Sequence, residues 1–416
     1  MTKLCRCCGE LLTVTFIDLG LSPLSNHFVK PEETGRPLSF YPLHTYVCGT
    51  CFLVQLEQVE LPEKIFGEYA YFSSYSDSWL EHAKLYAEMM MTKLGFHDVS
   101  RMTETHPLVV EIACNDGYLL QYFRESDIDT LGIEPARNVA EAASGKGIPV
   151  ITEFFGRELA QRLCMEDKQA DLLIGNNVLA HVPDLHDFVG GLNILLKDNG
   201  TLTMEFPHLL QLIKYHQFDT IYHEHFSYLS LHTVQRLMAE HGLTIFDVEQ
   251  LPTHGGSLRI YAKHTDDATK EMDQRVRWLL QLEEEAGLLQ IVTYTSFTSR
   301  IAQIKRNIWD FLVSQKNKGQ TIAAYGAPAK GNTLLNYCGI GKEMIDYVVD
   351  RNPYKQGLLL PGTLIPIYPP EHLSETKPDI VVIMPWNLKD EIAGQLAAIR
   401  GWGGKSAVWL PKIEMW

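Results

Sequence analysis

The sequence predicts an α/β protein with a small N-terminal metal-binding domain and two larger Rossmann-like domains, one central and one C-terminal. Short apolar runs alternate with helix-length segments in two separate parts of the chain, which indicates two parallel sheets covered by helices. Two Cys-x-x-Cys pairs lie in a first segment that has few apolar residues for a core. We therefore expect domains at residues 1–68, 69–300 and 301–416.

The composition is that of a globular protein and narrows the classes of function. The chain has 416 residues, of which 45% are hydrophobic, and a formal net charge of -15. Because a phosphate-binding surface normally needs a surplus of Lys and Arg, this charge argues against a nucleic-acid partner. No apolar run is long enough to span a bilayer, and the start MTKLCRCCGE lacks the apolar core of a signal peptide. We expect a cytoplasmic protein without a membrane partner, and the oligomeric state stays open.

The N-terminal segment combines short apolar alternations, at 13–17 and 46–56, with two cysteine pairs. Cys5 and Cys8 form the first pair, and Cys48 and Cys51 form the second. Four thiolates suit a tetrahedral Zn²⁺ site, which would supply folding energy to a segment without its own core. Such a closed site leaves no position for water, so we expect a structural zinc ion. Two alternatives stay open: reduced or redox-active thiols, and Cys7 as a competing ligand.

The central domain begins with an amphipathic helical pattern from Trp79, and strand-like runs follow it. These runs lie at 108–112, 130–133, 172–175 and 201–206. Two β-rich runs, 244–250 and 257–263, flank Gly255-Gly256 and predict an antiparallel hairpin that closes the sheet. A helical stretch is expected at 266–315.

The C-terminal domain repeats the alternation of strands and helices on a smaller scale. Its strand-like runs lie at 321–325, 345–349, 380–384 and 407–410. The segment YGAPAKGN follows the first of these runs and opens a helix, so backbone N–H groups and Lys330 could meet a diphosphate. Lys330 and Asn332 are our candidate substrate residues there, and an ordinary turn is the alternative. The segment 350–356 follows the next strand and adds weaker candidates.

The first central strand ends in LVVEIACNDGY, which is where an open α/β sheet binds its ligand. A single glycine in this loop disfavours NAD, because the dinucleotide motif needs three. Glu134, at the end of the next strand, could accept bonds from both ribose hydroxyls, although a surface acid is the alternative. These loops fit the adenosine of S-adenosylmethionine better than a dinucleotide. The candidate cofactor residues are Glu111, Cys114, Asn115, Gly117, Glu134, Pro135, Asn177 and His181.

The segment Tyr222-His223-Glu224-His225 lies just past the fourth central strand and crowds titratable groups at the expected mouth of the site. It is the best candidate for acid–base catalysis. The alternatives are structural hydrogen bonds at a helix start, or a metal site made from His223 and His225. Close by in the fold, the turn of the predicted hairpin offers His254, Ser257 and Arg259 to a substrate, with an ordinary tight turn as the alternative.

Several motifs together carry a resemblance to a known family. The order EIACNDGYLL, GIEP, NNVLAHVPD and the final hairpin resembles a class I methyltransferase. Together with the cysteine pairs, the segments YHEHFSYLSL, HGGSLRIY and YGAPAKGN resemble the sugar C-methyltransferases that act on nucleotide-linked 4-keto sugars. The first methyltransferase motif departs from the glycine-rich form. The resemblance covers nearly the whole chain.

The resemblance implies a structural zinc domain, a central domain that uses S-adenosylmethionine, and a C-terminal domain that helps to hold the nucleotide sugar. The implied substrate is a dTDP-linked 4-keto-deoxysugar, methylated at C-3 in branched deoxysugar biosynthesis. By resemblance His225 is the general base, Glu224 and Tyr222 orient it or stabilise an enolate, and Tyr75 reaches in from the zinc-domain side. Two competing functions stay open: an O- or N-methyltransferase, and a zinc-anchored binding protein with an inactive methyltransferase domain.

Overall fold

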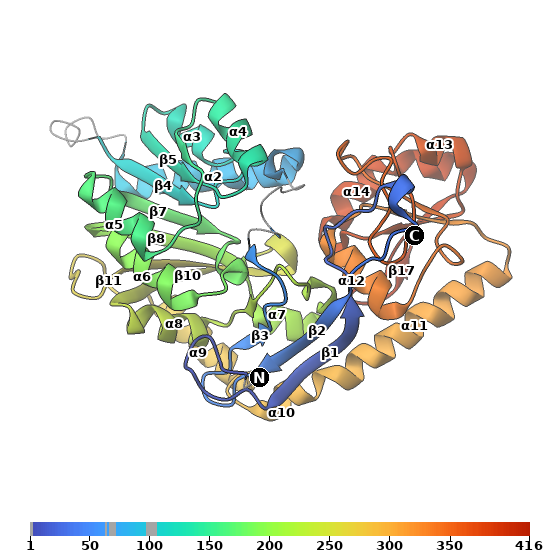
Figure 1. Cartoon of the computed structure of the whole chain (residues 1–416), viewed down its shortest axis with the longest axis horizontal. Helices are drawn as coiled ribbons and strands as arrows, with labels where there is room; N and C mark the ends of the chain where they lie inside the picture. Colours follow the sequence, from blue (N-terminus) through green and yellow to red (C-terminus); the bar gives the residue numbers. More distant parts are fainter. Residues whose placement is uncertain (1–2, 63–64, 66–71, 97–105) are drawn as a thin grey trace.

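The computed structural model describes residues 3–62, 65, 72–96 and 106–416. Figure 1 shows the central part and the C-terminal part side by side, with the N-terminal strands between them below. A long helix runs along the same lower edge and joins the two larger parts. Within the described ranges, no helix combines the length and the apolar character that crossing a membrane requires.

The N-terminal part is a four-stranded antiparallel sheet in the order β1-β2-β3-β9. Its strands are β1 (Val14–Ser22), β2 (Tyr41–Val47), β3 (Val54–Leu56) and β9 (Ser227–Tyr228). The alternation expected at 46–56 is therefore two strands, because the Cys48 to Cys51 turn separates them. Strand β9 comes from the segment that carries the predicted base, so this sheet is completed by a residue pair far along the chain.

The central sheet confirms the expected parallel α/β domain. Its order is β10-β11-β8-β7-β4-β5-β6, and β11 alone among them runs antiparallel to its neighbours. The predicted hairpin of β10 and β11 is confirmed. The strands are β4 (Leu108–Ile112), β5 (Asp129–Ile133), β6 (Val150–Ile151), β7 (Ala170–Asn176), β8 (Leu196–Pro207), β10 (Leu243–Leu251) and β11 (Ser257–His264).

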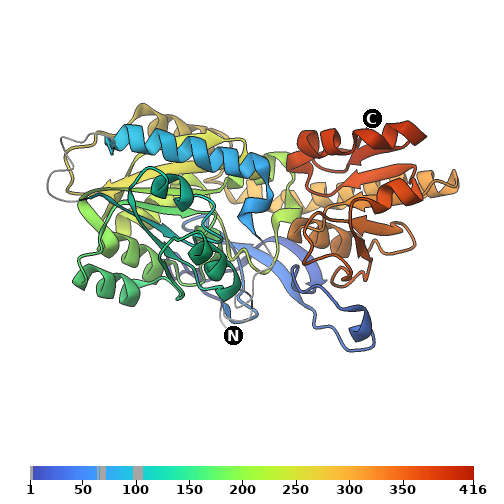
Figure 2. The same cartoon turned by 90° about the horizontal axis from the view of Figure 1, so that it is seen from above.

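Helices cover this sheet, and α2 (Asp77–Leu94) lies across its upper face in Figure 2. The other α-helices are α3 (Leu120–Arg124), α4 (Arg137–Gly145), α5 (Arg157–Met165), α6 (Leu185–Leu195), α7 (Leu209–Tyr215), α8 (Leu231–Glu240) and α9 (Gln274–Glu285). Short 3-10 turns sit at the strand ends that form the site. They are η2 (Ser73–Tyr75), η3 (Leu179–His181), η4 (Phe218–Thr220) and η5 (Thr253–Gly255).

The C-terminal part has a six-stranded sheet in the order β14-β13-β12-β15-β16-β17, parallel except at β17. Its strands are β12 (Ile322–Tyr325), β13 (Tyr347–Val349), β14 (Ile367–Tyr368), β15 (Ile380–Ile383), β16 (Lys405–Val408) and β17 (Glu414–Met415). Its helical segments are α12 (Ala329–Cys338), α13 (His372–Thr376), η6 (Trp386–Leu388), α14 (Lys389–Gln395) and η7 (Ala397–Trp402). The second Rossmann-like alternation is confirmed.

The helical stretch expected at 266–315 is interrupted. After α9 the chain turns at Gly287, whose φ is +82°, and continues as α10 (Ile291–Thr295) and α11 (Phe297–Asn317). The domain boundary expected at residue 300 falls inside α11. One apolar cluster joins α11, the N-terminal sheet and the C-terminal sheet, while a second joins the cysteine pairs to the central sheet. The N-terminal part thus shares a core with each of the others.

Candidate functional site

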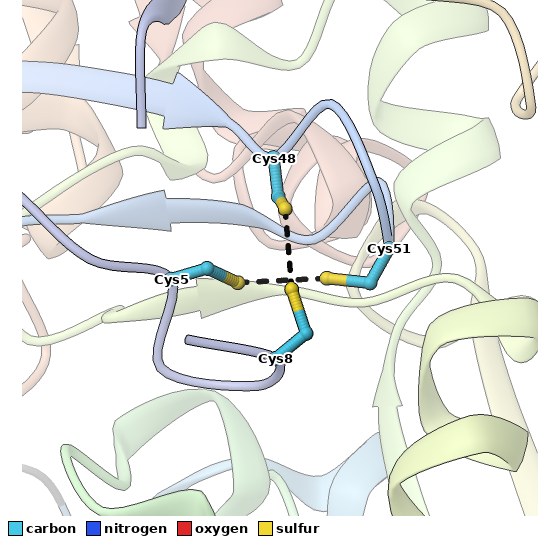
Figure 3. A group of neighbouring side chains, drawn as sticks. All are labelled: Cys5, Cys8, Cys48 and Cys51. Atoms are coloured by element: carbon cyan, nitrogen blue, oxygen red, sulfur yellow. Dashed lines mark hydrogen bonds between the residues drawn. The ribbon is translucent and has the colours of Figure 1, made fainter. Parts of the chain in front are cut away.

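Four cysteines converge from two loops of the N-terminal part, as Figure 3 shows. The sulfurs of Cys5, Cys8, Cys48 and Cys51 all lie within 4.8 Å of one another. Around a tetrahedral Zn²⁺ with Zn–S bonds of about 2.3 Å, neighbouring sulfurs would be roughly 3.8 Å apart. The observed Cys5–Cys51 and Cys8–Cys48 separations of 3.5 and 3.4 Å are close to that value. The donor set and its spacing fit the predicted structural zinc ion.

The surroundings of the cysteines also suit thiolates. Gln55 Nε2 donates to Cys5 Sγ at 3.1 Å, and the Thr50 amide donates to Cys48 Sγ at 3.4 Å. Donors of this kind orient and stabilise metal-bound sulfur. Cys7 is buried in the core next to these ligands and does not belong to the four-sulfur group, so it does not compete as a ligand in this arrangement.

The predicted cofactor loop lies between β4 and α3, and its backbone turns sharply. Asn115 and Gly117 have φ of +51° and +73°. A Cβ at Gly117 would come 2.4 Å from Ile148 Cδ1, so this position needs glycine for space as well as for conformation. The Asn115 side chain accepts from the Ser73 amide at 2.9 Å, which ties η2 to the loop.

Glu134 lies at the end of β5, as predicted, and holds the loop in place. Its two carboxylate oxygens accept from the backbone amides of Asn115 and Ala136 at 3.0 and 2.9 Å. Burial raises the pKa of Glu134 above its ordinary value, and these two bonds partly offset that rise. Each oxygen accepts one of these bonds, so lone pairs remain to receive ribose hydroxyls.

The remaining cofactor candidates divide into loop residues and core residues. Cys114 is fully buried, and its sulfur packs over Gly132, where a Cβ would lie 2.5 Å away, so its side chain belongs to the core. Glu111 is also fully buried, and burial raises its pKa well above the ordinary value. Pro135 and Asn177 are half-buried at the sheet edge.

Buried polar atoms at the same edge of the sheet, without partners in the described part of the chain, indicate a ligand site. Among the described residues, Asp116 Oδ1, Asn176 Oδ1 and Asn177 Oδ1 are buried without a hydrogen-bond partner. Buried polar atoms without partners are uncommon in native proteins. They lie just after β4 and at the end of β7, at the edge where the sequence places the adenosine group. This edge therefore fits a polar ligand such as S-adenosylmethionine.

Hydrogen bonds to its two ring nitrogens hold His225 in a single tautomer. Nδ1 lies 2.8 Å from the Thr220 carbonyl, which can only accept, so Nδ1 carries the hydrogen. The lone pair is therefore on Nε2, where the Tyr222 hydroxyl donates at 2.8 Å. Burial lowers the pKa of His225 well below its ordinary value, and the neighbouring His181 lowers it further. The neutral ring is the form that can accept a proton.

His181 lies with this cluster, although the sequence placed it among the cofactor residues. Its Nδ1 is 2.7 Å from the Glu224 carbonyl, and its ring centroid is 4.8 Å from that of His225. The short turn η3 after β7 produces this placement, because it carries the chain from the end of β7 toward His225. Glu224 is buried, and its side chain accepts from Asn26 Nδ2 at 2.6 Å. His223 instead turns away, toward the Pro42 carbonyl.

The C-terminal part reaches the same cluster through Lys330, which the sequence singled out, and through Trp386, which it did not. The indole nitrogen of Trp386 donates to Asp219 Oδ2 at 2.7 Å, one residue before Thr220. Lys330 lies over the Trp386 ring, 4.8 Å from its centroid, and donates to Asn387 at 2.7 Å. Burial lowers the pKa of Lys330 and raises that of Asp219 to about 6. Asp219, three residues before the YHEHFSY segment, was within reach of sequence reasoning, whereas Trp386 carried no signal.

The hairpin candidates have different surroundings. His254 is wedged against Trp79, with ring centroids 5.1 Å apart, and burial lowers its pKa to about 4. Ser257 donates its hydroxyl to the Thr253 carbonyl at 3.0 Å. Arg259 is buried between Glu205 and Glu249, at 3.1 and 3.2 Å, so its charge is satisfied by these acids.

Tyr75 and Asn332 contact residues other than His225. Tyr75 is 47% exposed and lies beside Phe72, whose ring stacks on Tyr354 of the C-terminal part. It therefore sits where the cofactor loop meets that part. Asn332 is buried and donates to the Ser25 carbonyl at 2.6 Å, which joins α12 to the N-terminal part. Both residues lie between domains.

Three family models match consecutive parts of the chain. Residues 5–66 match a zinc binding domain, 86–248 a methyltransferase domain, and 252–411 a C-methyltransferase C-terminal domain. C-methyltransferase NovU from Streptomyces niveus is 33% identical over 408 residues, which cover 98% of this chain and 95% of that protein.

Matches to solved structures cover about half of this chain at low identity. Magnesium protoporphyrin IX methyltransferase from Synechocystis PCC 6803 has a TM-score of 0.33 at 16% identity, covering 48% of this chain and 88% of that one. The PH0226 protein from Pyrococcus horikoshii OT3 has a TM-score of 0.36 at 15% identity, covering 49% and 97%. The matches along the sequence, together with the sheet order and the four-cysteine cluster, lead to one conclusion: the chain belongs to the family of zinc-domain, S-adenosylmethionine-dependent C-methyltransferases.

Proposed function

We propose that the protein methylates C-3 of a dTDP-linked 4-keto-deoxysugar, in the biosynthesis of a branched deoxysugar, after His225 has removed the C-3 proton. The observation that supports this most is the tautomer of His225. Its Nδ1–H is committed to the Thr220 carbonyl, and its unprotonated Nε2 accepts from the Tyr222 hydroxyl. A neutral imidazole of this kind is suited to general-base catalysis.

The chemistry of a 4-keto sugar matches such a base. The C-4 ketone acidifies the neighbouring C-3 proton, because the electron pair left behind is delocalised onto the ketone oxygen as an enolate. The proton goes to His225 Nε2. Before substrate binds, the Tyr222 hydroxyl donates to that nitrogen and orients it, and the substrate then takes the place of the hydroxyl at Nε2. S-adenosylmethionine, when bound, supplies the electrophilic methyl group that C-3 attacks.

Groups that could hold the substrate come from the central and C-terminal parts, and the N-terminal part braces one of them. Lys330 and Trp386 come from the C-terminal part, His254 from the central hairpin, and Glu224, braced by Asn26, from the base segment. A cation beside a developing enolate or a diphosphate is stabilising in a site that excludes water. We infer that the C-terminal part helps to bind the nucleotide sugar, with Lys330 as its main contact.

The test is methyl transfer to a substrate labelled with deuterium at C-3. The pure protein is incubated with S-adenosylmethionine and a panel of 3-deuterio dTDP-4-keto-6-deoxyhexoses, and products are analysed by mass spectrometry and NMR. We expect a product that has gained a methyl group on carbon and lost the label. A methylated product that retains the deuterium would mean transfer to an atom other than C-3, such as oxygen, nitrogen or another carbon, and would sink the proposal.

A further inference from the structure

The two-residue strand that follows the predicted base is part of the zinc-binding sheet. Strand β9 pairs with β3, so that Ser227 lies opposite Gln55. Gln55 in turn donates to Cys5 Sγ and accepts from the Arg6 amide at 3.0 Å. A continuous set of hydrogen bonds therefore runs from the cysteine cluster to the base segment.

Arg6 lies inside the first cysteine pair and makes the most direct of these links. Its guanidinium donates to the carbonyl of Phe226, the residue after His225, and to the Leu56 carbonyl at 2.9 Å. The Phe226 carbonyl also accepts from the Leu56 amide at 2.9 Å, while the Phe226 amide donates to Ala180 at 2.7 Å. The peptide groups on both sides of Phe226 are thus held, one from the zinc side and one from η3.

The zinc-loaded cluster could also supply a counter-charge for Arg6. The guanidinium of half-buried Arg6 donates to neutral carbonyls, and withdrawing a cation from water is costly unless a counter-charge lies near. A zinc ion with four thiolates carries a net negative charge, because the thiolates outweigh the divalent ion. Cys5 is the neighbour of Arg6 in the chain, so the zinc-loaded cluster would supply that counter-charge.

We propose that Arg6 is a positioning residue that couples the zinc centre to the base, so that the zinc domain sets the geometry of His225 as well as the stability of the N-terminal part. This inference rests on the proposed role of His225. It predicts that loss of Arg6 leaves the zinc and the cofactor bound, yet misplaces the base. A shift of about 1 Å in a reacting group can lower turnover by as much as a hundredfold.

The test compares Arg6→Ala with Arg236→Ala. Arg236 is the matched control, because it is a neighbour of the same cysteines but pairs with Glu240 on its own helix at 3.1 Å. We expect Arg6→Ala to lower kcat at least tenfold, to leave KM for S-adenosylmethionine within about twofold, and to retain zinc. Hydrogen exchange at residues 226–229 should rise in Arg6→Ala and stay at the wild-type level in Arg236→Ala.

Conservative variants keep the proposal falsifiable if Arg6→Ala does not fold. Arg6→Lys retains the charge with all its donors on a single nitrogen, and Arg6→Gln retains N–H donors without the charge, so each should fall between wild type and Arg6→Ala in both kcat and exchange. Wild-type kcat and wild-type protection of residues 226–229 in Arg6→Gln would overturn the coupling. Failure of the wild-type protein to methylate the labelled sugars would instead sink the proposed function, since exchange and zinc content are measured without sugar.

Discussion

The cofactor edge and the base segment are held in place in different ways. Glu134 fixes the cofactor loop through amides 19 and 2 residues away. The base segment is held by Arg6, Asn26 and Trp386, which are 220, 198 and 167 residues from their partners. The first half of the site is thus built by local backbone geometry. The second exists only when the three parts of the chain are assembled.

This difference predicts that the two halves can be damaged separately. A change at the base segment, or at any remote residue that braces it, should lower turnover while cofactor binding survives. A change at Glu134 should weaken the cofactor while the chemistry at saturation survives. The following variants and conditions test that separation, from the largest expected effect to the smallest.

His225→Ala should have the largest effect, a loss of roughly 10²- to 10⁴-fold in kcat, because a general base contributes about that much. The affinity for S-adenosylmethionine, measured by calorimetry, should stay within about twofold. His372→Ala is the control, since His372 lies in α13 of the C-terminal part and pairs with Glu375 on the same helix. Turnover of His225→Ala near the wild-type rate would contradict the assignment of the base.

Glu134→Gln should raise the Kd for S-adenosylmethionine roughly 10- to 100-fold, because a hydrogen bond to a charged acceptor contributes about 1.5–3 kcal/mol. The value of kcat at saturating cofactor should change little. Glu141→Gln, at an exposed position on α4, provides the comparison. An unchanged Kd would show that Glu134 braces the loop without contacting the ribose.

Trp386→Phe should lower kcat by several-fold up to about tenfold, because it removes the donor to buried Asp219 while it keeps most of the packing. Cofactor affinity should not change. Trp402→Phe removes a comparable bond, from the indole to the Pro378 carbonyl at 3.1 Å, within the C-terminal part. If both variants lower kcat equally, the effect comes from the C-terminal fold and not from the base segment.

Acidification should destabilise the base half before the cofactor half. Burial lowers the pKa of His181, His223 and His254 to about 4. The unfolded chain therefore binds more protons than the folded chain below the ordinary histidine pKa, and stability falls as pH falls from about 6.5 toward 4. Between pH 7 and 6 the expected loss is under about 1 kcal/mol per ring.

Carboxyl groups act in the opposite direction. Burial raises the pKa of Glu111, Glu134 and Asp219, so their protonation favours the folded state as pH falls and offsets part of the loss. Protection from hydrogen exchange is compared at pH 7 and pH 5.5. As the pH falls, the peptides around His223 and His254 should lose protection first. Equal loosening around Asn115 and Glu134 would contradict this separation.

The sequence best predicted the features that are determined by short stretches of the chain. Runs of alternating apolar residues identified the long strands and the hairpin, and cysteine spacing identified the metal site, because each pattern is complete within a short stretch. Strand β9 was not predicted, since a two-residue strand has no periodicity and depends on pairing with β3. His181 was placed with the cofactor because its strand leads there, and only the turn η3 carries it to His225. Arg6 and Trp386 lie in segments that carry no signal for their partners.

The central claim is that His225 removes the C-3 proton of a 4-keto sugar, and solvent exchange tests it most directly. The protein is saturated with S-adenosylhomocysteine, which cannot donate a methyl group, and mixed with a 3-deuterio dTDP-4-keto-6-deoxyhexose that the wild-type enzyme methylates. The account predicts that the wild type releases the label to solvent, as followed by NMR, and that His225→Ala does not. Release of the label by His225→Ala at the wild-type rate would contradict it.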